Sequence, residues 1–373
     1  MYYPGLAAAR GGTLFTFFFT LRETRHMALL WIEGFENIGS TDNAAVSPTG
    51  ILGRKYTASI DSGTKLQPGR IAGHSLEVGY ANSIRTRTLT TNATMIVGCA
   101  WRASSFSVSA GYSDVIIGLA DDTQKGTCLC ITTTGDLAVY RDSTLLKKTT
   151  GLGLSVNTWY YLEFKVTCNS TTGSFEVRLG GVNVLSDTGV NTKAGTHNYH
   201  NNLLLGWLVS GQTCRYDDLY VCDASGAVNN TFLGNMKVLS ISPTGDTATE
   251  QFTPSANASH YTLVDDNPID DDTTYTEDSV SGHQDIWDYG TVVGAGATIA
   301  GIQINTCVRE TDANSFTLKT PIVSGGNTST DAAQAIGTTN YIVRYRISET
   351  DPNTTAAWTA NGVNAAQFGV EVG

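Results

Sequence analysis

The stretch WYYLEFKV, residues 159–166, decides the fold class of this protein. Apolar side chains occupy every second position of it, which predicts a β-strand with one face in a core and the other toward solvent. The turn-forming run NSTTG, residues 169–173, follows directly, and residues 175–179 alternate again. We therefore expect an antiparallel hairpin. The residues expected in the core are Tyr160, Leu162, Phe164 and Val166.

The same pattern of short strand and turn recurs on both sides of this hairpin. Only 15% of the residues are charged and 41% are hydrophobic, and no segment before residue 225 has a convincing helical period. Strands that recur every 8 to 12 residues are typical of an antiparallel sandwich. The stretches are VIIGLADD (115–122), GTCLCITTTGDLAVYRD (126–142), LLKKTTGLGL (145–154), NNLLLGWLV (201–209) and CRYDDLYVCD (214–223).

The 373 residues exceed the usual size of one domain, so we expect two. A sandwich over 27–233 is expected to precede a smaller β-rich domain over 234–373. In the second part we expect a strand near Met236 and Val238, an exposed acidic loop at 265–282 and a helical turn in WTANGVNAAQF, residues 358–368. Further strands are expected in IWDYGTVV (286–293), ATIAGIQINTCV (297–308), SFTLKTPIV (315–323) and NYIVRYRI (340–347).

Residues 1–26 are expected to be a poorly defined extension. Their apolar run TLFTFFFTL, residues 13–21, is shorter than the roughly 20 residues that cross a bilayer. Arg22, Glu23 and Arg25 stand where a signal peptide needs small residues. The pattern fits an over-extended start of the reading frame, so we predict no membrane role.

Charge and cysteine usage restrict the partners and the compartment. A net charge of −11 argues against nucleic-acid binding, which depends on Lys and Arg. The seven cysteines include no CxxC pair, so neither a disulfide framework nor a zinc site has the right spacing. We expect most of them to be reduced and buried.

Short catalytic motifs are absent from the sequence. It contains no GxSxG, no HExxH and no phosphate-binding glycine loop. Sandwich glycosidases of the laminarinase kind carry ExDxxE, but the nearest matches end in Ser315 and Thr354 instead of the final Glu. We therefore predict a protein that is not an enzyme, with no catalytic residues and no cofactor, although a Glu pair from distant strands stays open.

Two groups of residues are candidate metal ligands. His197 and His200 could share a metal, but their Asn-rich surroundings favour a solvated loop. Asp217 is expected to share an inward face with Leu219 and Val221, where its carboxylate needs partners. Asp217 and Asp218 are thus calcium candidates, with carboxylates that accept backbone N–H bonds as the alternative.

Trp159 and Tyr161 are the glycan-binding candidates. Both lie on the outward face of the deciding strand, where exposed aromatic faces would stack on sugars. The alternative is that a second sheet or domain covers them, because large aromatic residues are usually buried.

Two stretches resemble known families. Residues 157–184 with 203–226 resemble the second half of a laminin-G or concanavalin A-like sandwich, with a Trp-led strand and a closing DDLYV strand. Residues 232–372 resemble the C-terminal region of bacteriophage virion proteins that carry such a sandwich. The resemblance implies an all-β, jelly-roll sandwich followed by a second β-rich domain. It carries over no catalytic residue.

The resemblance also implies a function. We expect a virion surface protein, such as a capsid decoration, fibre or tail component, assembled in the bacterial cytoplasm and present in several copies. The lack of paired cysteines fits that reducing compartment. Its expected partners are other virion proteins, copies of itself and a host-surface glycan. A lectin-like glycan-binding module is the alternative, and a sandwich glycoside hydrolase is a third.

Overall fold

The computed structural model describes residues 27–373 apart from 43–44, 46–49, 59–62, 80–83, 87, 107, 110–111, 124–125, 208–211, 292–293, 295 and 312–314. The N-terminal extension, 1–26, therefore lies outside the described residues. Within the described part, no helix is both long and apolar enough to cross a membrane.

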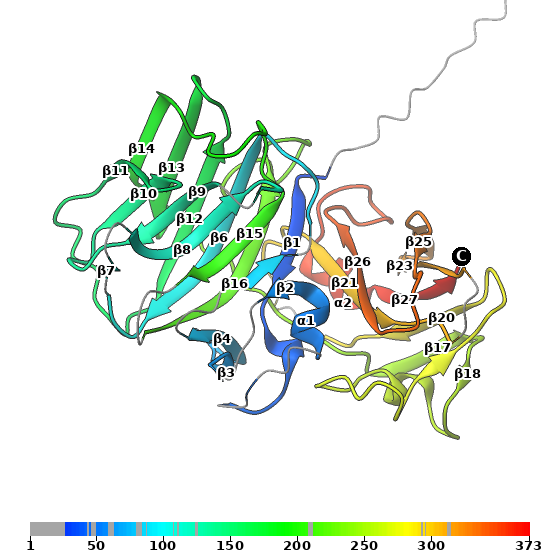
Figure 1. Ribbon diagram of the computed structural model, residues 1–373. Coiled ribbons are helices and arrows are strands. Elements are labelled where there is room, and N and C mark those ends of the chain that lie inside the picture. The colour runs from blue at the N-terminus through cyan, green and yellow to red at the C-terminus, as the bar shows by residue number, and fades with distance from the viewer. Residues whose placement is uncertain are drawn as a thin grey trace, which may run out of the picture.

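Two antiparallel sheets face each other in the first part of the chain (Figure 1). The first has the order β14-β13-β12-β6-β16-β4-β3, and β1 also pairs with β16. Its strands are β1 (Leu29–Glu33), β3 (Lys65–Pro68), β4 (His74–Gly79), β6 (Thr94–Ala103), β12 (Tyr160–Thr167), β13 (Gly173–Leu179), β14 (Val182–Val190) and β16 (Thr213–Asp223). We call it sheet A.

The opposing sheet, sheet B, has the order β11-β10-β9-β8-β15-β5-β2, with β7 on β8. Its strands are β2 (Tyr56–Ala58), β5 (Ile84–Thr86), β7 (Val108–Ser109), β8 (Tyr112–Ala120), β9 (Gly126–Ile131), β10 (Leu137–Arg141), β11 (Thr144–Lys148) and β15 (Asn202–Trp207). Two short helices, η1 (Glu36–Ile38) and α1 (Ile51–Lys55), connect β1 to β2.

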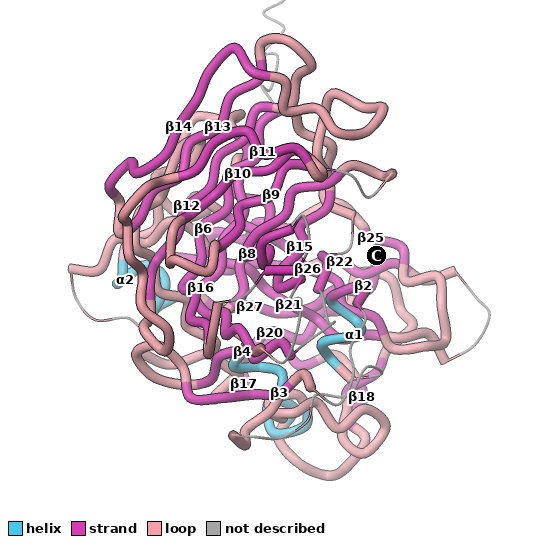
Figure 2. Tube along the Cα trace, turned by 60° about the vertical axis from the view of Figure 1, so that its left-hand side comes forward, coloured by secondary structure: helices cyan, strands magenta, loops and turns pink. Residues whose placement is uncertain are grey.

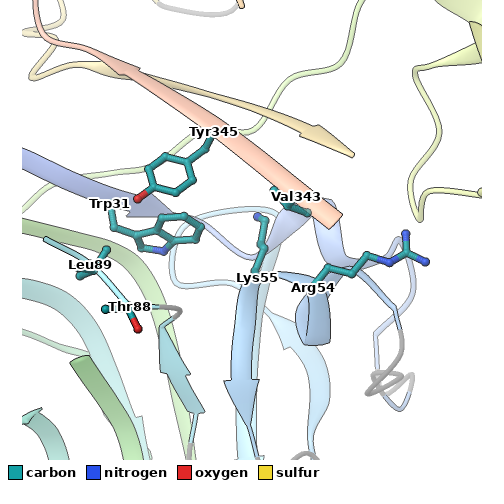
Figure 3. A pocket seen from close by; sticks show the side chains of 7 residues that line it. All are labelled: Trp31, Arg54, Lys55, Thr88, Leu89, Val343 and Tyr345. Atoms are coloured by element: carbon teal, nitrogen blue, oxygen red, sulfur yellow. The ribbon is translucent and has the colours of Figure 1, made fainter. Parts of the chain in front are cut away.

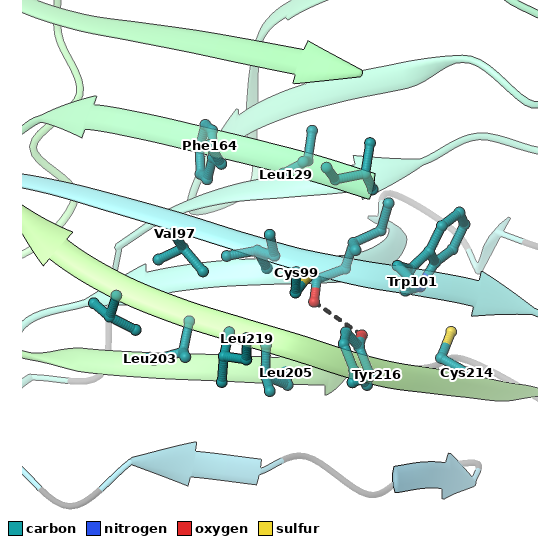
Figure 4. Packing of buried hydrophobic residues seen from close by; sticks show 14 of the residues in the cluster. Val97, Cys99, Trp101, Leu129, Phe164, Leu203, Leu205, Cys214, Tyr216 and Leu219 are labelled. Carbon is teal, nitrogen blue, oxygen red and sulfur yellow. Dashed lines mark hydrogen bonds between the residues drawn. The ribbon is translucent and has the colours of Figure 1, made fainter. Parts of the chain in front are cut away.

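One hydrophobic core fills the space between the two sheets (Figure 4). Phe164 and Trp101 of sheet A, both fully buried, belong to the same cluster as Leu129 and Leu205 of sheet B. The expected β12–β13 hairpin forms, with Phe164 opposite Val177. The predicted all-β sandwich is thus confirmed, and the alternating strand supplies core residues as expected. The prediction that its other face meets solvent is wrong, because Tyr161 and Glu163 are buried there.

The regular elements in the rest of the chain are also mainly β-strands (Figure 2). A seven-stranded sheet contains the path β17-β20-β27-β22-β25 together with β23 and β24, and β18–β19 and β21–β26 form separate pairs. The elements are β17 (Gly245–Glu250), β18 (Thr253–Pro254), η2 (His260–Leu263), β19 (Thr276–Glu277), β20 (Gln284–Asp288), β21 (Ile302–Val308), β22 (Thr317–Lys319), β23 (Pro321–Ser324), β24 (Asn327–Thr330), β25 (Gln334–Ala335), β26 (Ile342–Ser348), α2 (Ala360–Ala365) and β27 (Gln367–Val372).

Most expectations for this part are confirmed, and one is wrong. Helix α2 lies where the sequence predicted a helical turn, and β21 and β26 lie within stretches that were expected to be strands. The expected strand near Met236 and Val238 does not form, because this segment bonds to side chains instead of to a neighbouring strand. The Val238 N–H donates to Asp218 Oδ1, and the Met236 carbonyl accepts from Arg70.

Sheet A has a second apolar layer on its outer face. Tyr161 and Tyr220 belong to a buried cluster there with Ile347 of β26, and Met236 packs against it. Glu349 accepts hydrogen bonds from the N–H groups of Ala28 and Leu29, next to β1. The segment after residue 226 therefore covers the sandwich, and a domain boundary at 234 stays a prediction.

Candidate functional site

The two aspartates predicted as calcium ligands lie at an irregularity of β16. The pairing of β16 with β6 shifts register between Asp217 and Tyr220, and Asp218 has a left-handed φ of 50°. A bulge of this kind inserts one extra residue into the strand. The side chains after the bulge therefore point to the opposite face from the one that simple alternation predicts. The expectation that Asp217 shares the inward face of Leu219 and Val221 is therefore wrong.

Both carboxylates bond instead to groups on the outer side of sheet A. Asp217 accepts from the Arg70 N–H at 2.7 Å and from the Asp218 N–H at 2.8 Å. Asp218 accepts from the Val238 N–H and from Arg70 Nε, both at 2.8 Å. The arrangement matches the alternative in which backbone N–H groups satisfy the aspartates.

The carboxyl groups around Arg70 are protonated more readily than usual. Burial raises the pKa of Asp217 to about 7, with a further contribution from Asp218. Burial also raises the pKa of Asp218, and it raises the pKa of Glu36 to about 8. Oε2 of Glu36 is buried without a hydrogen-bond partner in the part of the chain that the structure describes.

Calcium at Asp217 and Asp218 stays a prediction that this geometry does not favour. A cation would compete with the Arg70 guanidinium, which lies 2.7 Å from Asp218. Across the described ranges, no three His, Cys, Asp or Glu side chains converge in a way that could hold a metal ion.

The two aromatic candidates for glycan binding have different surroundings. Tyr161 is 4% exposed, its hydroxyl donates to the Asp218 carbonyl, and the Arg70 guanidinium lies over its ring. It therefore has no open face for a sugar, because the segment after residue 226 covers it. Trp159 is half-buried and packs against the same cluster.

A polar surface that the sequence did not reveal as a binding site lies at one end of sheet B. Strands β8 and β15 pair so that Ala120 lies opposite Asn202, and the residues after β8 are therefore adjacent to those before β15. We call this surface the polar rim. Its members are Asp121, Asp122, Thr123, His197, Tyr199 and Asn201.

Hydrogen bonds hold the side chains of the polar rim in place. Asp122 accepts from the Tyr199 hydroxyl at 2.7 Å and from Asn201 Nδ2 at 2.6 Å, and these bonds lower its pKa. Burial acts to raise the pKa of Asp121, but hydrogen bonds from Thr123 and His197 outweigh it and lower the pKa. Both carboxylates are therefore ionised at neutral pH.

The two candidate histidine ligands, His197 and His200, are in unlike environments. His197 is half-exposed, stacks on Tyr199 with ring centres 4.7 Å apart and bonds to Asp121. His200 is 1% exposed, and burial lowers its pKa to about 4. The motif HNYH could have indicated this surface, because it places a His ring and a Tyr ring two residues apart.

Comparison with known proteins adds only a fold class. No family model and no curated protein matches this chain. Several solved structures have a limited likeness to this chain. One is the alginate lyase Aly36B, which is 14% identical, and the match covers 54% of this chain and 98% of the lyase with a TM-score of 0.39. Another is domain 4 of the arabinanase AbnA from Geobacillus stearothermophilus, in complex with arabinotriose. It is 15% identical, and the match covers 54% of this chain and 95% of that domain with a TM-score of 0.37.

An endo-β-1,4-glucuronan lyase from the fungus Trichoderma reesei has 13% identity over 49% of this chain and 95% of that one, with a TM-score of 0.35. The paired sheets of the described residues make this chain a β-sandwich protein. Likenesses at this level assign neither its substrate nor its activity.

The expectation that this chain is not an enzyme is corrected here. Two of the similar structures are polysaccharide lyases, so a sandwich without short hydrolase or nucleotide-binding motifs is compatible with catalysis. The sequence argument failed because general acids and bases can come from separate strands that no short motif records.

Proposed function

We propose that the sandwich is a glycan-binding module and that the polar rim is its binding surface. The observation that carries the proposal is the exposed Asp122 carboxylate, which is fixed by Tyr199 and Asn201 beside an aromatic ring. Each carboxylate oxygen keeps a free lone pair, which can accept a hydrogen bond from a sugar hydroxyl.

Preorganisation is the physical reason why this surface suits a polar ligand. His197 stacks on one face of Tyr199 at an interplanar angle of 22°, and Asp122 holds the Tyr199 hydroxyl. A ligand therefore meets side chains that have already lost their rotational freedom, so less entropy is lost on binding. A half-exposed ring with a polar edge also offers both apolar and hydrogen-bonding contact.

Binding to a panel of purified polysaccharides and oligosaccharides tests the proposal. For whichever glycan binds, we expect Asp122→Asn and Tyr199→Ala each to weaken the affinity about tenfold or more, which corresponds to about 1.4 kcal/mol. Isothermal titration calorimetry measures the change. Failure of the wild-type chain to bind any glycan of the panel would overturn the proposal.

Two control variants separate the polar rim from the rest of the protein surface. Glu277 is exposed in β19, so Glu277→Gln removes one negative charge elsewhere and should leave binding unchanged. Trp159→Phe alters the other aromatic candidate. If Trp159→Phe abolishes binding while Asp122→Asn does not, the glycan site lies on sheet A and the polar rim is excluded.

The same glycans distinguish binding from cleavage. A lyase breaks the chain by elimination and leaves an unsaturated sugar, which absorbs in the ultraviolet, whereas a hydrolase yields only new reducing ends. Incubation of each bound glycan with the protein, followed by both assays, shows whether the module also degrades its ligand.

A virion surface role is a second candidate function. The supporting observation is that all seven cysteines are free thiols and five of them are buried, as expected of a chain that folds in a reducing cytoplasm. Other virion proteins and further copies of the chain remain its predicted partners. Mass spectrometry of purified particles tests this role, and absence of the chain from particles made in its host would exclude it.

A further inference from the structure

A buried lysine, a carboxylate and an asparagine amide meet where η1 packs on α1. Lys55 Nζ lies 2.8 Å from Glu33 Oε2 and 3.0 Å from Asn37 Oδ1. The side chain of Lys55 is fully buried and that of Glu33 is 2% exposed. These three groups lie outside both the polar rim and the Asp217–Asp218 pair.

The sequence places the three groups together through two short helices. Glu33 ends β1, Asn37 lies in η1, and Lys55 ends α1. Phe35, at a left-handed φ of 66°, makes the turn, and its N–H donates to Glu33 Oε1 at 3.0 Å. The Glu33 carboxylate is therefore held by a backbone N–H as well as by Lys55.

Aromatic side chains enclose the group on the side of β2. Figure 3 shows Lys55 beside Trp31, and the Lys55 amine lies 6.0 Å from the centre of the Trp31 ring. Trp31 Nε1 donates to the Tyr56 hydroxyl. That hydroxyl donates in turn to Glu33 Oε2 at 3.2 Å. Tyr56 is 1% exposed. Ionised groups in such surroundings are costly to keep, because little water reaches them.

We propose that Lys55 and Asn37 form an intramolecular amide cross-link, with Glu33 as the proton-transfer group. Glu33 Oε2 takes a proton from the Lys55 ammonium, and the neutral amine attacks Asn37 Cγ. The new Nζ–Cγ bond replaces the Cγ–Nδ2 bond. Nδ2 receives the proton that Glu33 holds and one of the two protons that remain on Nζ, and it leaves as an ammonium ion.

The reaction balances without any further reagent. The lysine ammonium brings three hydrogens and the asparagine amide two, of which the new amide keeps one and the ammonium ion carries away four. No group is oxidised or reduced. Proximity favours the step, because the amine is held against the carbonyl and away from competing water. The product also removes the buried ammonium charge.

Mass spectrometry of the intact, natively purified protein tests the cross-link. We expect the measured mass to be lower than the mass calculated from the sequence by the mass of one ammonia molecule. After trypsin, residues 26–54 and 55–65 should appear as one branched peptide, because the linked Lys55 resists cleavage. Tandem fragmentation then places the branch at Asn37.

Variants test the roles of Glu33 and Lys55. Glu33→Gln and Lys55→Arg should each restore the full mass calculated from the sequence. Lys147 is an exposed lysine that donates to the Ser186 carbonyl, so the control variant Lys147→Arg should keep the cross-link. The proposal is overturned if wild-type protein incubated for days at neutral pH keeps the full mass and releases residues 56–65 as a free peptide. A cross-link that persists in Glu33→Gln would overturn the role of Glu33. The wild-type measurement does not depend on how any variant folds.

Discussion

Glu36 shows how burial of a single carboxyl couples the fold to pH. Its pKa is raised from 4.5 to about 8, chiefly by burial, and nearby Asp217 and Asp218 add to the effect. Gly73, whose φ is 69°, leaves the space that the Glu36 side chain occupies, since a Cβ there would lie 2.8 Å from Glu36 Cγ. The protonated acid is the form that this site favours.

We predict that the free energy of unfolding falls as the pH rises from 6.5 to 8.5. The unfolded chain has already lost the Glu36 proton in this window, while the folded chain keeps it until about pH 8. Folding therefore binds a proton, and stability declines with pH. Burial of His200 acts in the opposite direction, but only below its ordinary pKa of 6.5.

Urea denaturation at several pH values measures this slope. Glu36→Gln should flatten it, because the amide does not titrate, and Asp217→Asn should do so to a lesser degree. Glu277→Gln, in an exposed strand, is the matched control and should leave the slope unchanged. A wild-type slope that Glu36→Gln does not alter would contradict the prediction.

At the scale of elements, β16 shows where alternation alone misleads. Leu219 and Val221 face the core as predicted, but the bulge before them turns Asp217 to the outer side, where Arg70 meets it. One extra residue in a strand changes the face of every side chain on one side of it. The sequence carries no mark of this insertion other than the Asp-Asp pair.

Helix α2 allows a test at the same scale. Thr359 is exposed, and its hydroxyl accepts from the Gly362 N–H at 3.0 Å, so it caps the helix. We expect Thr359→Ala to lower the free energy of unfolding by about 1 kcal/mol, because a first-turn N–H loses its partner. Thr359→Ser keeps the hydroxyl, so its free energy of unfolding should fall by only a few tenths of a kcal/mol. Equal losses of stability in both variants would contradict the assignment of Thr359 as the helix cap.

At the scale of the whole molecule, the two parts of the chain share buried surface. Glu349 binds the N–H groups of Ala28 and Leu29 and also Asn229, and Arg54 forms a two-point ion pair with Asp271. Ile347 belongs to the apolar cluster on the outer face of sheet A. The sandwich therefore depends on residues far along the chain for part of its burial.

A shortened chain tests this dependence. We predict that residues 27–233 alone unfold at a lower temperature than the full chain and associate in solution, because Tyr161, Tyr220 and Ile96 lose their cover. Calorimetry and size-exclusion chromatography measure the two effects. A monomeric fragment with an unchanged melting temperature would instead support an independent domain that ends at 233.

The sequence by itself determined the all-β class, the β12–β13 hairpin, most of the strands and helix α2. These are local features, which follow from side-chain alternation and from turn and capping residues near one another in the chain. Only the tertiary structure decided which surfaces are covered and which groups meet. The polar rim joins residues 121–123 to 197–201, and the Lys55 group joins three separate elements. Such meetings depend on strand pairing across long stretches of chain, which periodicity does not encode.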